Sequence, residues 1–464
     1  MRRRCYLFVD IKLIATHLLR RSYPIQLSWV VPTAHKNNDV DNLGNPIKMS
    51  NMKNGLPLLF FLISHLAFSQ NFKFDFGTGK VKKKHVRISP EMAYSKERSY
   101  GYMMSGTRFF TVDLPEGNYD VKMVLGDEKE PAETTIKVEN RRLMLEKVVT
   151  KAGNFEKRTF TVNVRTPQIN ATEKVKLKPR EFDYLHWDNQ LTFEFCGKNP
   201  QIKTLEISPN SKATTIFLAG NSTVVDQAQE PFAAWGQMIP RFFQAGKVVI
   251  ANHAESGESL KSFLAAKRLD KVVSQMKAGD YLFIEFAHND QKQKDLRPFV
   301  EYKELLKKFI SATKSKGGIP VLVTSMHRRN FDSTGHIINT LGDFPEAMRQ
   351  TAQEESVPLI DLNAMSKTLW EALGAETSKK AFVHYPAGSF PNQEKPLADN
   401  THFSNYGAYQ LAKCIVEGIK KAPLGIAQQL LPNLPTYNPA HPDSLDTWDF
   451  PQSPLVNVIK PDGN

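Results

Sequence analysis

The sequence predicts an all-β sandwich followed by a flavodoxin-like three-layer α/β/α domain with a parallel sheet. Three observations lead to this fold class. The chain has 464 residues, which is too many for one ordinary core. Short alternating polar and apolar runs separated by turns fill residues 70–210. From residue 211 to 425, continuous apolar runs of strand length alternate with amphipathic helical stretches.

The first 69 residues are expected to lie outside both domains. Residues 49–69 combine a short positive start, an apolar run and a small-residue cleavage site, which is typical of a signal peptide. The apolar run is too short to cross a bilayer, so no integral membrane segment is expected after cleavage. Residues 1–48 lack clean periodicity and are interpreted as a disordered upstream extension. We therefore expect a secreted or periplasmic protein that begins near Gln70.

The first domain, residues 70–210, is expected to contain no convincing helix. Its strand-like runs are FKFDFG (72–77), RFFTVDL (108–114), NYDVKMVLG (118–126), RTFTVNV (158–164) and QLTFEFCG (190–197). A turn at residues 115–118 predicts a hairpin between the second and third of these runs. The stretch LPEGNYDVKMVLGD resembles the galactose-binding-like β-sandwiches that accompany many glycan-active enzymes.

The second domain, residues 211–425, has five buried strand candidates. They are TTIFLAG (214–220), KVVIANHA (247–254), DYLFIEFAH (280–288), IPVLVTSM (319–326) and PLIDL (358–362). Helical stretches are expected over 259–277, 301–316 and 405–421, the last after the N-cap Ser404. Sites in such folds lie beyond the carboxyl ends of the strands. A Pro-rich tail, residues 426–464, is expected to cover part of the surface.

Composition argues against several classes of function. The net charge is +13, but residues 1–53 supply nearly half of it, and the rest is scattered without a basic run. We therefore predict no nucleic-acid partner. None of the three cysteines forms a CxxC pair, and HEXXH is absent, so we predict no metal and no cofactor. Four histidines, His253, His288, His327 and His384, could still form a metal site in space.

Candidate catalytic residues follow separate strands of the second domain. Ser222 comes directly after the first strand, and a serine needs a neighbouring base to become a nucleophile. Gly257 follows the second strand and Asn289 the third, where a backbone amide and a side-chain amide can stabilise an oxyanion. Asp399 and His402, three apart on an expected loop before the last helix, can pair so that the imidazole faces the serine.

The order Ser, Gly, Asn, Asp-x-x-His resembles the SGNH (GDSL-like) hydrolases. Longer strings resemble their rhamnogalacturonan acetylesterase branch: IFLAGNSTVVDQ, WGQMIPRFF, ANHAESGESLKSF, GDYLFIEFAHNDQK and DNTHFSNYGA. The resemblance covers residues 213–421. It implies Ser222 as nucleophile, His402 as base and Asp399 as its orienter. It also implies an oxyanion hole formed by the amides of Ser222 and Gly257 together with Asn289.

Two positions depart from the family pattern. Asn221 stands where the family usually has Asp, and Ala287 where it usually has Gly. The aspartate is not part of the triad, so the catalytic interpretation stands, while the methyl group of Ala287 could crowd the oxyanion pocket. Two alternatives stay open: an SGNH lipase or esterase acting on other acyl esters, and a secreted glycan-binding protein without catalysis. An α/β-hydrolase is disfavoured because the chain has no G-x-S-x-G elbow.

The resemblance implies an acetylated polysaccharide substrate, with acetyl groups removed from rhamnogalacturonan or another pectin. Such a polymer carries galacturonate carboxylates, so its site should contain fixed positive charge. Arg328 and Arg329 follow the fourth strand, at the same edge of the sheet as Ser222. Because arginine suits bidentate carboxylate recognition, we predict that one of them contacts a galacturonate.

Overall fold

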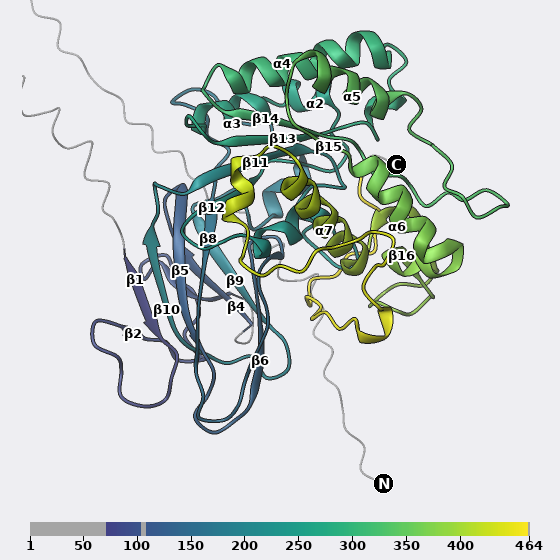
Figure 1. The fold of residues 1–464 in the computed structure, drawn as a ribbon. Coiled ribbons are helices and arrows are strands. Elements are labelled where there is room, and N and C mark those ends of the chain that lie inside the picture. Colours follow the sequence, from purple (N-terminus) through teal and green to yellow (C-terminus); the bar gives the residue numbers. More distant parts are fainter. Residues whose placement is uncertain (1–70, 104–107, 463–464) are drawn as a thin grey trace, which may run out of the picture. The chain divides into compact units, whose positions relative to one another are not determined.

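Two five-stranded sheets form the first folded region of the computed structural model, which describes residues 71–103 and 108–462 (Figure 1). The strand orders are β2-β1-β10-β5-β8 and β3-β4-β9-β6-β7, antiparallel throughout except for the pair β1–β2. The strands are β1 (Phe72–Asp75), β2 (Val86–Arg87), β3 (Tyr100–Met103), β4 (Phe109–Asp113), β5 (Gly117–Leu125), β6 (Ala132–Val138), β7 (Arg142–Thr150), β8 (Glu156–Val164), β9 (Gln190–Cys196) and β10 (Ile202–Pro209). The predicted upstream extension and signal peptide lie outside the described residues.

The two sheets share one apolar core, as alternation along their strands predicts. Phe74 and Val121 from the first sheet and Phe110 and Leu191 from the second belong to a single buried cluster. The rings of Phe74 and Phe110 meet edge to face with centroids 5.2 Å apart. The all-β expectation for this region is therefore confirmed, with the 3-10 turn η2 (Pro179–Asp183) as a short helical interruption.

The expected hairpin at residues 115–118 is wrong. Strand β4 pairs with β3 and β9, whereas β5 pairs with β10 and β8 in the other sheet. The turn thus carries the chain from one sheet to the other. The cause is non-local, because both strands find their hydrogen-bonding partners among segments far away in the sequence, and a local turn signal cannot reveal these.

Five parallel strands build the second region in the order β12-β11-β13-β14-β15, which confirms the flavodoxin-like sheet (Figure 1). They are β11 (Thr214–Gly220), β12 (Val248–Asn252), β13 (Tyr281–Glu285), β14 (Ile319–Val323) and β15 (Leu359–Ile360). Along β11, Phe217 and Ala219 face one apolar cluster while Ile216 and Leu218 face another. Both faces of the sheet are therefore buried, which explains the uninterrupted apolar strands.

Helices cover both faces of this sheet. One layer contains α2 (Leu260–Ala265), α3 (Arg268–Gln275), α4 (Lys303–Lys314) and α5 (Phe344–Glu354), and the opposite layer contains α1 (Trp235–Met238), α6 (Leu362–Thr377) and α7 (Asn405–Lys421). Helix α7 begins as predicted, since Ser404 accepts a hydrogen bond from the amide of Gly407. None of the helices in the described part of the chain is long and apolar enough to cross a membrane.

The helical stretch 259–277 is broken in two at Lys267, which has a φ of 59°. The break is explained by charged contacts with the segment between β8 and β9. Lys267 pairs with Glu173, and Arg268 Nη2 lies 2.5 Å from Glu181 Oε2 with both side chains buried. These long-range ion pairs set the direction of α3, whereas the apolar periodicity alone indicates one continuous stretch.

The sandwich and the α/β region share a buried polar interface within one compact unit. Arg141 Nη2 lies 2.6 Å from Glu230 Oε1, and Arg142 Nε lies 2.9 Å from Asp226 Oδ2. All four side chains are buried, and Leu143 of β7 joins the apolar cluster beneath α7. The sandwich is therefore joined to the loop 221–232 that follows β11, directly beyond Ser222.

Candidate active site

The side chain of His402 lies between those of Ser222 and Asp399. Its Nε2 atom is 3.0 Å from Ser222 Oγ, and its Nδ1 atom is 2.7 Å from Asp399 Oδ2. All three residues are buried. The structure thus brings together the three residues that the sequence singled out, in the relative order that a nucleophile, a base and an orienting carboxylate require.

Asp399 and His402 do not lie on a loop, as we expected, but on the strand β17 (Leu397–Phe403). This strand pairs antiparallel with β16 (Phe382–Tyr385), with an irregularity in register beside Phe382. Asp399 Oδ1 accepts hydrogen bonds from the amides of Thr401 and His402, at 2.8 and 3.1 Å. These bonds turn the backbone so that its Oδ2 atom meets the imidazole three residues later.

The surroundings of Asp399 favour the ionised form of its carboxyl group. Burial alone would raise its pKa, but the hydrogen bond and charge of His402 and the two backbone amides lower it to about 2. Lys460, from the C-terminal segment, adds a further cation 3.6 Å from Asp399 Oδ2. A permanently negative partner suits a histidine that must accept and return a proton, because it stabilises the imidazolium.

The turn that carries Ser222 is built by its two flanking residues. Asn221 Oδ1 accepts from both the amide and the hydroxyl of Thr223, at 3.0 and 2.8 Å. A Cβ at Gly220 would lie 2.4 Å from a methyl group of Val224, so only glycine fits there. An aspartate could accept the same two bonds, and the departure from the family pattern at position 221 therefore preserves the turn.

Hydrogen bonds connect the three loops that hold the predicted oxyanion donors. Gln227 Nε2 donates to the carbonyl of Ser222 at 2.9 Å and approaches Ser256 Oγ at 3.4 Å. Gly257 has a φ of 81°, a conformation that favours glycine. Asn289 Nδ2 donates to the carbonyl of Glu258 at 2.9 Å, which leaves its second amide hydrogen to point elsewhere.

The methyl group of Ala287 lies in the apolar core. The residue is buried in the apolar cluster between the sheet and helices α2–α5. Its methyl group therefore packs with Phe286 and neighbouring core side chains. Asn289, two residues further on, immediately precedes the short 3-10 turn η4 (Asp290–Lys292).

Glu285 is an important residue that the sequence analysis missed. It is fully buried at the end of β13 and accepts hydrogen bonds from Trp235 Nε1 and Ser325 Oγ, each at 2.9 Å, and it lies 3.2 Å from Thr223 Oγ1. Burial raises its pKa to about 7, although these three donors act to lower it. Its contacts connect the turn that carries Ser222 to α1 and to the segment directly after β14. The only signal in the sequence was one acid inside the apolar run YLFIEFA.

The two predicted substrate-binding arginines differ in their surroundings. Arg328 lies beside the loop that follows β13 and carries Asn289. Its guanidinium donates to Thr340 Oγ1 at 3.2 Å and approaches the carbonyl of His288 at 3.4 Å. Arg329 instead donates to Asn400 Oδ1 at 3.0 Å and Ser378 Oγ at 3.2 Å. Arg329 is thus engaged in holding β17 against the end of α6, whereas Arg328 borders the triad.

The four histidines considered for a metal site do not form one. Within residues 71–103 and 108–462, no group of three or more His, Cys, Asp or Glu side chains could hold a metal ion. His253 packs its ring against Trp187 and Phe217, and His384 Nε2 lies 2.8 Å from Asn400 Oδ1. The rings of His253 and His384 are therefore held by contacts within the fold.

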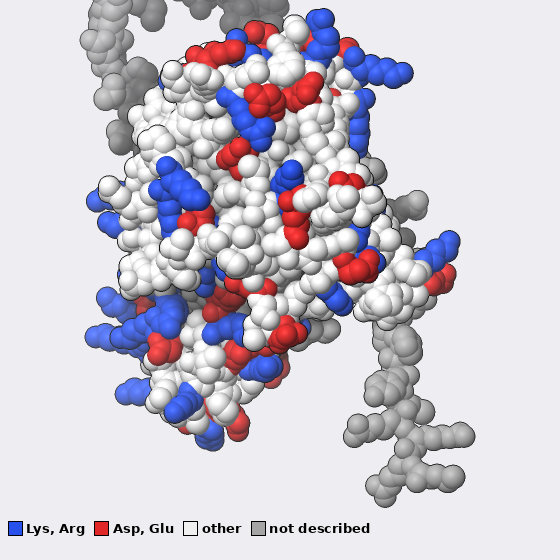
Figure 2. All heavy atoms as spheres, turned by 45° about the vertical axis from the view of Figure 1, so that its right-hand side comes forward, with Lys and Arg blue, Asp and Glu red and all other residues white. Residues whose placement is uncertain are grey.

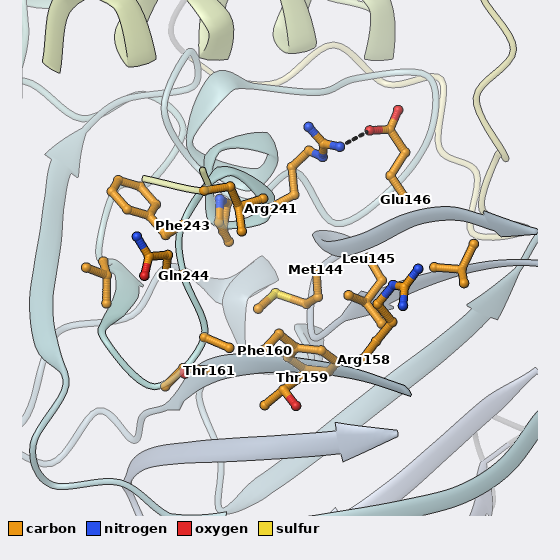
Figure 3. A pocket seen from close by; sticks show the side chains of 15 residues that line it. Met144, Leu145, Glu146, Arg158, Thr159, Phe160, Thr161, Arg241, Phe243 and Gln244 are labelled. Carbon is orange, nitrogen blue, oxygen red and sulfur yellow. Dashed lines mark ion pairs between the residues drawn. The ribbon is translucent and has the colours of Figure 1, made fainter. Parts of the chain in front are cut away.

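A separate cavity of about 410 Å³ lies between β7, β8 and the 3-10 turn η3 (Ile239–Phe242) (Figure 3). Met144, Phe160 and Phe243 line it, and an ion pair joins Arg241 Nη2 to Glu146 Oε2 at 3.0 Å. Val248, the first residue of β12, also lines it. The cavity therefore sits at the amino end of the parallel sheet, away from Ser222 at the carboxyl end.

Comparison with known proteins places the site in context. Residues 218–408 match the GDSL-like Lipase/Acylhydrolase family. The chain is 42% identical over 222 residues to the rhamnogalacturonan acetylesterase RhgT of Bacillus subtilis (strain 168), covering 47% of this chain and 95% of that protein. It is 32% identical over 224 residues to the probable rhamnogalacturonan acetylesterase YesY of the same organism, covering 47% of this chain and 98% of that protein.

The crystal structure of the protein YxiM from Bacillus subtilis is also similar. It is 23% identical in sequence, with a TM-score of 0.43, and the match covers 76% of this chain and 98% of that one. The family match spans every residue singled out as nucleophile, base, orienting acid or oxyanion donor.

Proposed function

Because the chain belongs to the GDSL-like lipase/acylhydrolase family and is a carboxylic ester hydrolase, we propose that it removes acetyl groups from plant cell-wall polysaccharide. Within this class of polysaccharide, we propose rhamnogalacturonan as the substrate. The observation that carries the proposal is the hydrogen-bonded line from Ser222 Oγ through His402 to Asp399, within a domain similar to two rhamnogalacturonan acetylesterases. An intact triad disfavours the alternative of a glycan-binding protein without catalysis.

The proposed reaction is acyl transfer through Ser222. His402 Nε2 accepts the hydroxyl proton as Ser222 Oγ attacks the acetyl carbonyl, and Asp399 holds the other ring nitrogen. The amides of Ser222 and Gly257 and the side chain of Asn289 stabilise the oxyanion. His402 then protonates the departing sugar hydroxyl. Water, activated by the same histidine, releases acetate and restores the serine.

Positive charge beside the triad supports an anionic polymer as substrate. Lys292, Arg328 and Lys460 come from three distant segments and lie close enough to interact. Burial and the charges of Arg328 and Lys460 lower the pKa of Lys292. Elsewhere, basic and acidic side chains are interspersed on the face shown in Figure 2. A local excess of cations at the site is what the carboxylates of a galacturonate-containing polymer require.

The proposal is tested by measuring acetate release from a panel of acetylated polysaccharides. We expect the highest kcat/KM on rhamnogalacturonan, lower values on acetylated xylan, and none with Ser222→Ala. Equal rates on long-chain acyl esters would favour the SGNH lipase alternative instead.

Arg328 is tested separately as a carboxylate contact. Arg328→Ala should lose kcat/KM on acetylated pectic oligosaccharides while sparing a small neutral acetyl ester. Arg329→Ala serves as the comparison, and we expect it to affect both substrates together, because Arg329 supports the strand that carries Asp399 and His402. Equal activity of the Arg328 variant on both substrates would remove this residue from the substrate site.

We further propose that the protein is exported. The proposal is based on the signal-peptide pattern of residues 49–69. In addition, an enzyme that acts on a plant polymer must reach this substrate outside the cell. N-terminal sequencing of the protein from culture medium or periplasm should find a start near Gln70. A mature chain that retains residues 1–48 would contradict both the cleavage and the export.

A further inference from the structure

A small side pocket lies near the triad and is built by four separate parts of the chain. It encloses about 130 Å³ and is lined by Arg180, Tyr184, Gln227, Phe232, Ser256 and Asp462, among others. Gln227 donates to the carbonyl of Ser222 at 2.9 Å, and the ring of Phe232 lies edge-on to that of His402 with centroids 5.8 Å apart. Two residues that line the pocket therefore contact Ser222 and His402.

Arg180 is fixed in this pocket by one edge of its guanidinium. Nε and Nη2 donate to Glu255 Oε1 at 3.0 and 2.6 Å, and Nη2 also donates to the carbonyl of Ser256 at 2.8 Å. Its Nη1 atom contacts the carboxylate of Asp462. Arg180 belongs to the segment between β8 and β9, so the sandwich region itself supplies a cation to the mouth of the site.

Asp462 brings a carboxylate to the loop that holds a predicted oxyanion donor. A Cβ built on Gly257 would lie 3.0 Å from Asp462 Cβ. The segment is anchored upstream, where the carbonyl of Leu455 and the amide of Asn457 bond to the backbone of Glu230, each at 2.8 Å. Nearer its end, Lys460 and Asp462 reach the site through side chains that are 47% and 63% exposed.

We propose that Arg180 forms a carboxylate-binding subsite for a uronate of the substrate, and that Asp462 occupies this subsite in the unliganded enzyme. The inference rests on the proposed function and names a subsite within it. The carboxylate of Asp462 already contacts Arg180 Nη1, and Asp462 lies next to Gly257. The position of this carboxylate marks where the carboxylate of a uronate next to the acetylated sugar can bind. Glu255 holds the guanidinium in place, so little ordering is needed when the ligand arrives.

The exchange of Asp462 for substrate is easy because the Asp462 side chain is exposed to solvent, although that of Arg180 is only 31% exposed. An exposed ion pair changes an equilibrium by about fivefold at most, the equivalent of about 1 kcal/mol. A polymer that offers several carboxylates can therefore displace this segment. Removing the charge of Asp462 should strengthen binding of the anionic substrate by no more than the same factor.

The experiment compares acetylated pectic oligosaccharides with the same oligosaccharides after methyl esterification of their carboxylates. Acetate release gives KM for both substrates, and 4-nitrophenyl acetate reports whether the triad works. We expect Asp462→Asn to lower KM for the anionic form by about two- to fivefold and to leave KM for the esterified form unchanged. A truncation of residues 461–464, which removes Asp462 and keeps Lys460, should act in the same direction. The control Asp446→Asn, an exposed acid in the turn η8 (Leu445–Thr447), should change neither.

Arg180→Gln should abolish the preference for the anionic form. Should this variant fail to fold, the two changes at the C-terminal segment still decide. An unchanged or raised KM for the anionic form in Asp462→Asn would overturn the inference, because the segment would then be no competitor. A wild-type protein that releases no acetate from any substrate would instead refute the proposed function, which keeps the two failures distinct.

Discussion

At the scale of single residues, the proposed reaction depends on the hydroxyl of Ser222. We expect Ser222→Ala to keep its fold, because the change removes one oxygen atom from a buried turn that Asn221 and Thr223 hold together. Hydrolysis of an acetyl ester should fall almost to background, since only the oxyanion donors and substrate binding would remain. Ser315→Ala, at the exposed end of α4, is the control and should retain full kcat. A folded Ser222→Ala protein with near-normal kcat would refute the triad.

Asn289 is expected to act on the transition state rather than on substrate affinity. Asn289→Ala should lower kcat by roughly 10²–10³ with little change in KM, because in the proposed reaction its side-chain amide stabilises charge that develops only in the transition state. Its present bond to the carbonyl of Glu258 fixes the orientation of that amide. Steady-state kinetics on a small acetyl ester separate the two parameters, and a pure KM effect would place Asn289 in substrate binding instead.

Glu285 should make the stability of the protein depend on pH. Its pKa in the folded state is raised to about 7, above the value near 4.5 of an unfolded chain, so the folded protein holds this proton more tightly. Its contribution is therefore complete below about pH 4.5 and is lost as the pH rises through about 7. The loss is of order 3 kcal/mol.

Urea unfolding at pH 5 and pH 8 measures this effect. Glu285→Gln, which cannot titrate, should show a smaller drop in unfolding free energy between the two pH values than the wild type. Glu301→Gln is the matched control, because that carboxylate is partly exposed in the segment before α4 and its pKa is lowered, chiefly by Arg297. An identical pH dependence in wild type and Glu285→Gln would contradict the assignment.

At the scale of elements, helix α7 begins directly after the strand that carries Asp399 and His402. Ser404 caps it by accepting from the amide of Gly407 and also donates to the carbonyl of Lys380 at 2.7 Å. Ser404→Ala should lower the unfolding free energy by about 1 kcal/mol, the usual cost of losing a cap. Ser444→Ala, at the cap of the exposed three-residue turn η8, should cost less. Chemical denaturation of both variants makes the comparison.

At the scale of the whole molecule, the sandwich and the α/β region are held together by buried charges. Arg141 lies 2.6 Å from Glu230 and also donates to the carbonyl of Phe232 at 2.8 Å and to Asn405 Oδ1 at 3.0 Å. Arg141→Ala leaves Glu230 buried without its cation, so we expect a loss of about 3–5 kcal/mol. The half-exposed pair of Arg158 and Glu156 gives the control, where Arg158→Ala should cost less than about 1 kcal/mol.

Calorimetry of the wild type should show a single unfolding transition, because the sandwich and the α/β region are held together by these buried ion pairs. Because Arg141 and Arg142 contact the loop beyond Ser222, the sandwich cannot detach without exposing that loop. In Arg141→Ala we expect the transition to shift to lower temperature or to split in two. Two separate transitions in the wild type would show that the halves unfold independently.

The sequence by itself determined the parallel sheet, and it singled out Ser222, Asp399 and His402, whose side chains the structure brings together. Apolar runs such as TTIFLAG and DYLFIEFAH are strands because both faces of the sheet must be covered, and this requirement acts on each strand locally. The nucleophile turn, the cap at Ser404 and the order Ser, Gly, Asn, Asp-x-x-His are likewise short-range patterns. They can be recognised without knowing which segments meet in space.

Only the tertiary structure decided the partners of charged and polar groups that are far apart in sequence. The break at Lys267, the strand that holds Asp399 and His402, the burial of Glu285 and the position of Asp462 beside Arg180 depend on such partners. A charged side chain looks the same in the sequence whether it is solvated or paired. Its role is fixed by desolvation and by the distance to its partner, and neither exists until the chain has folded.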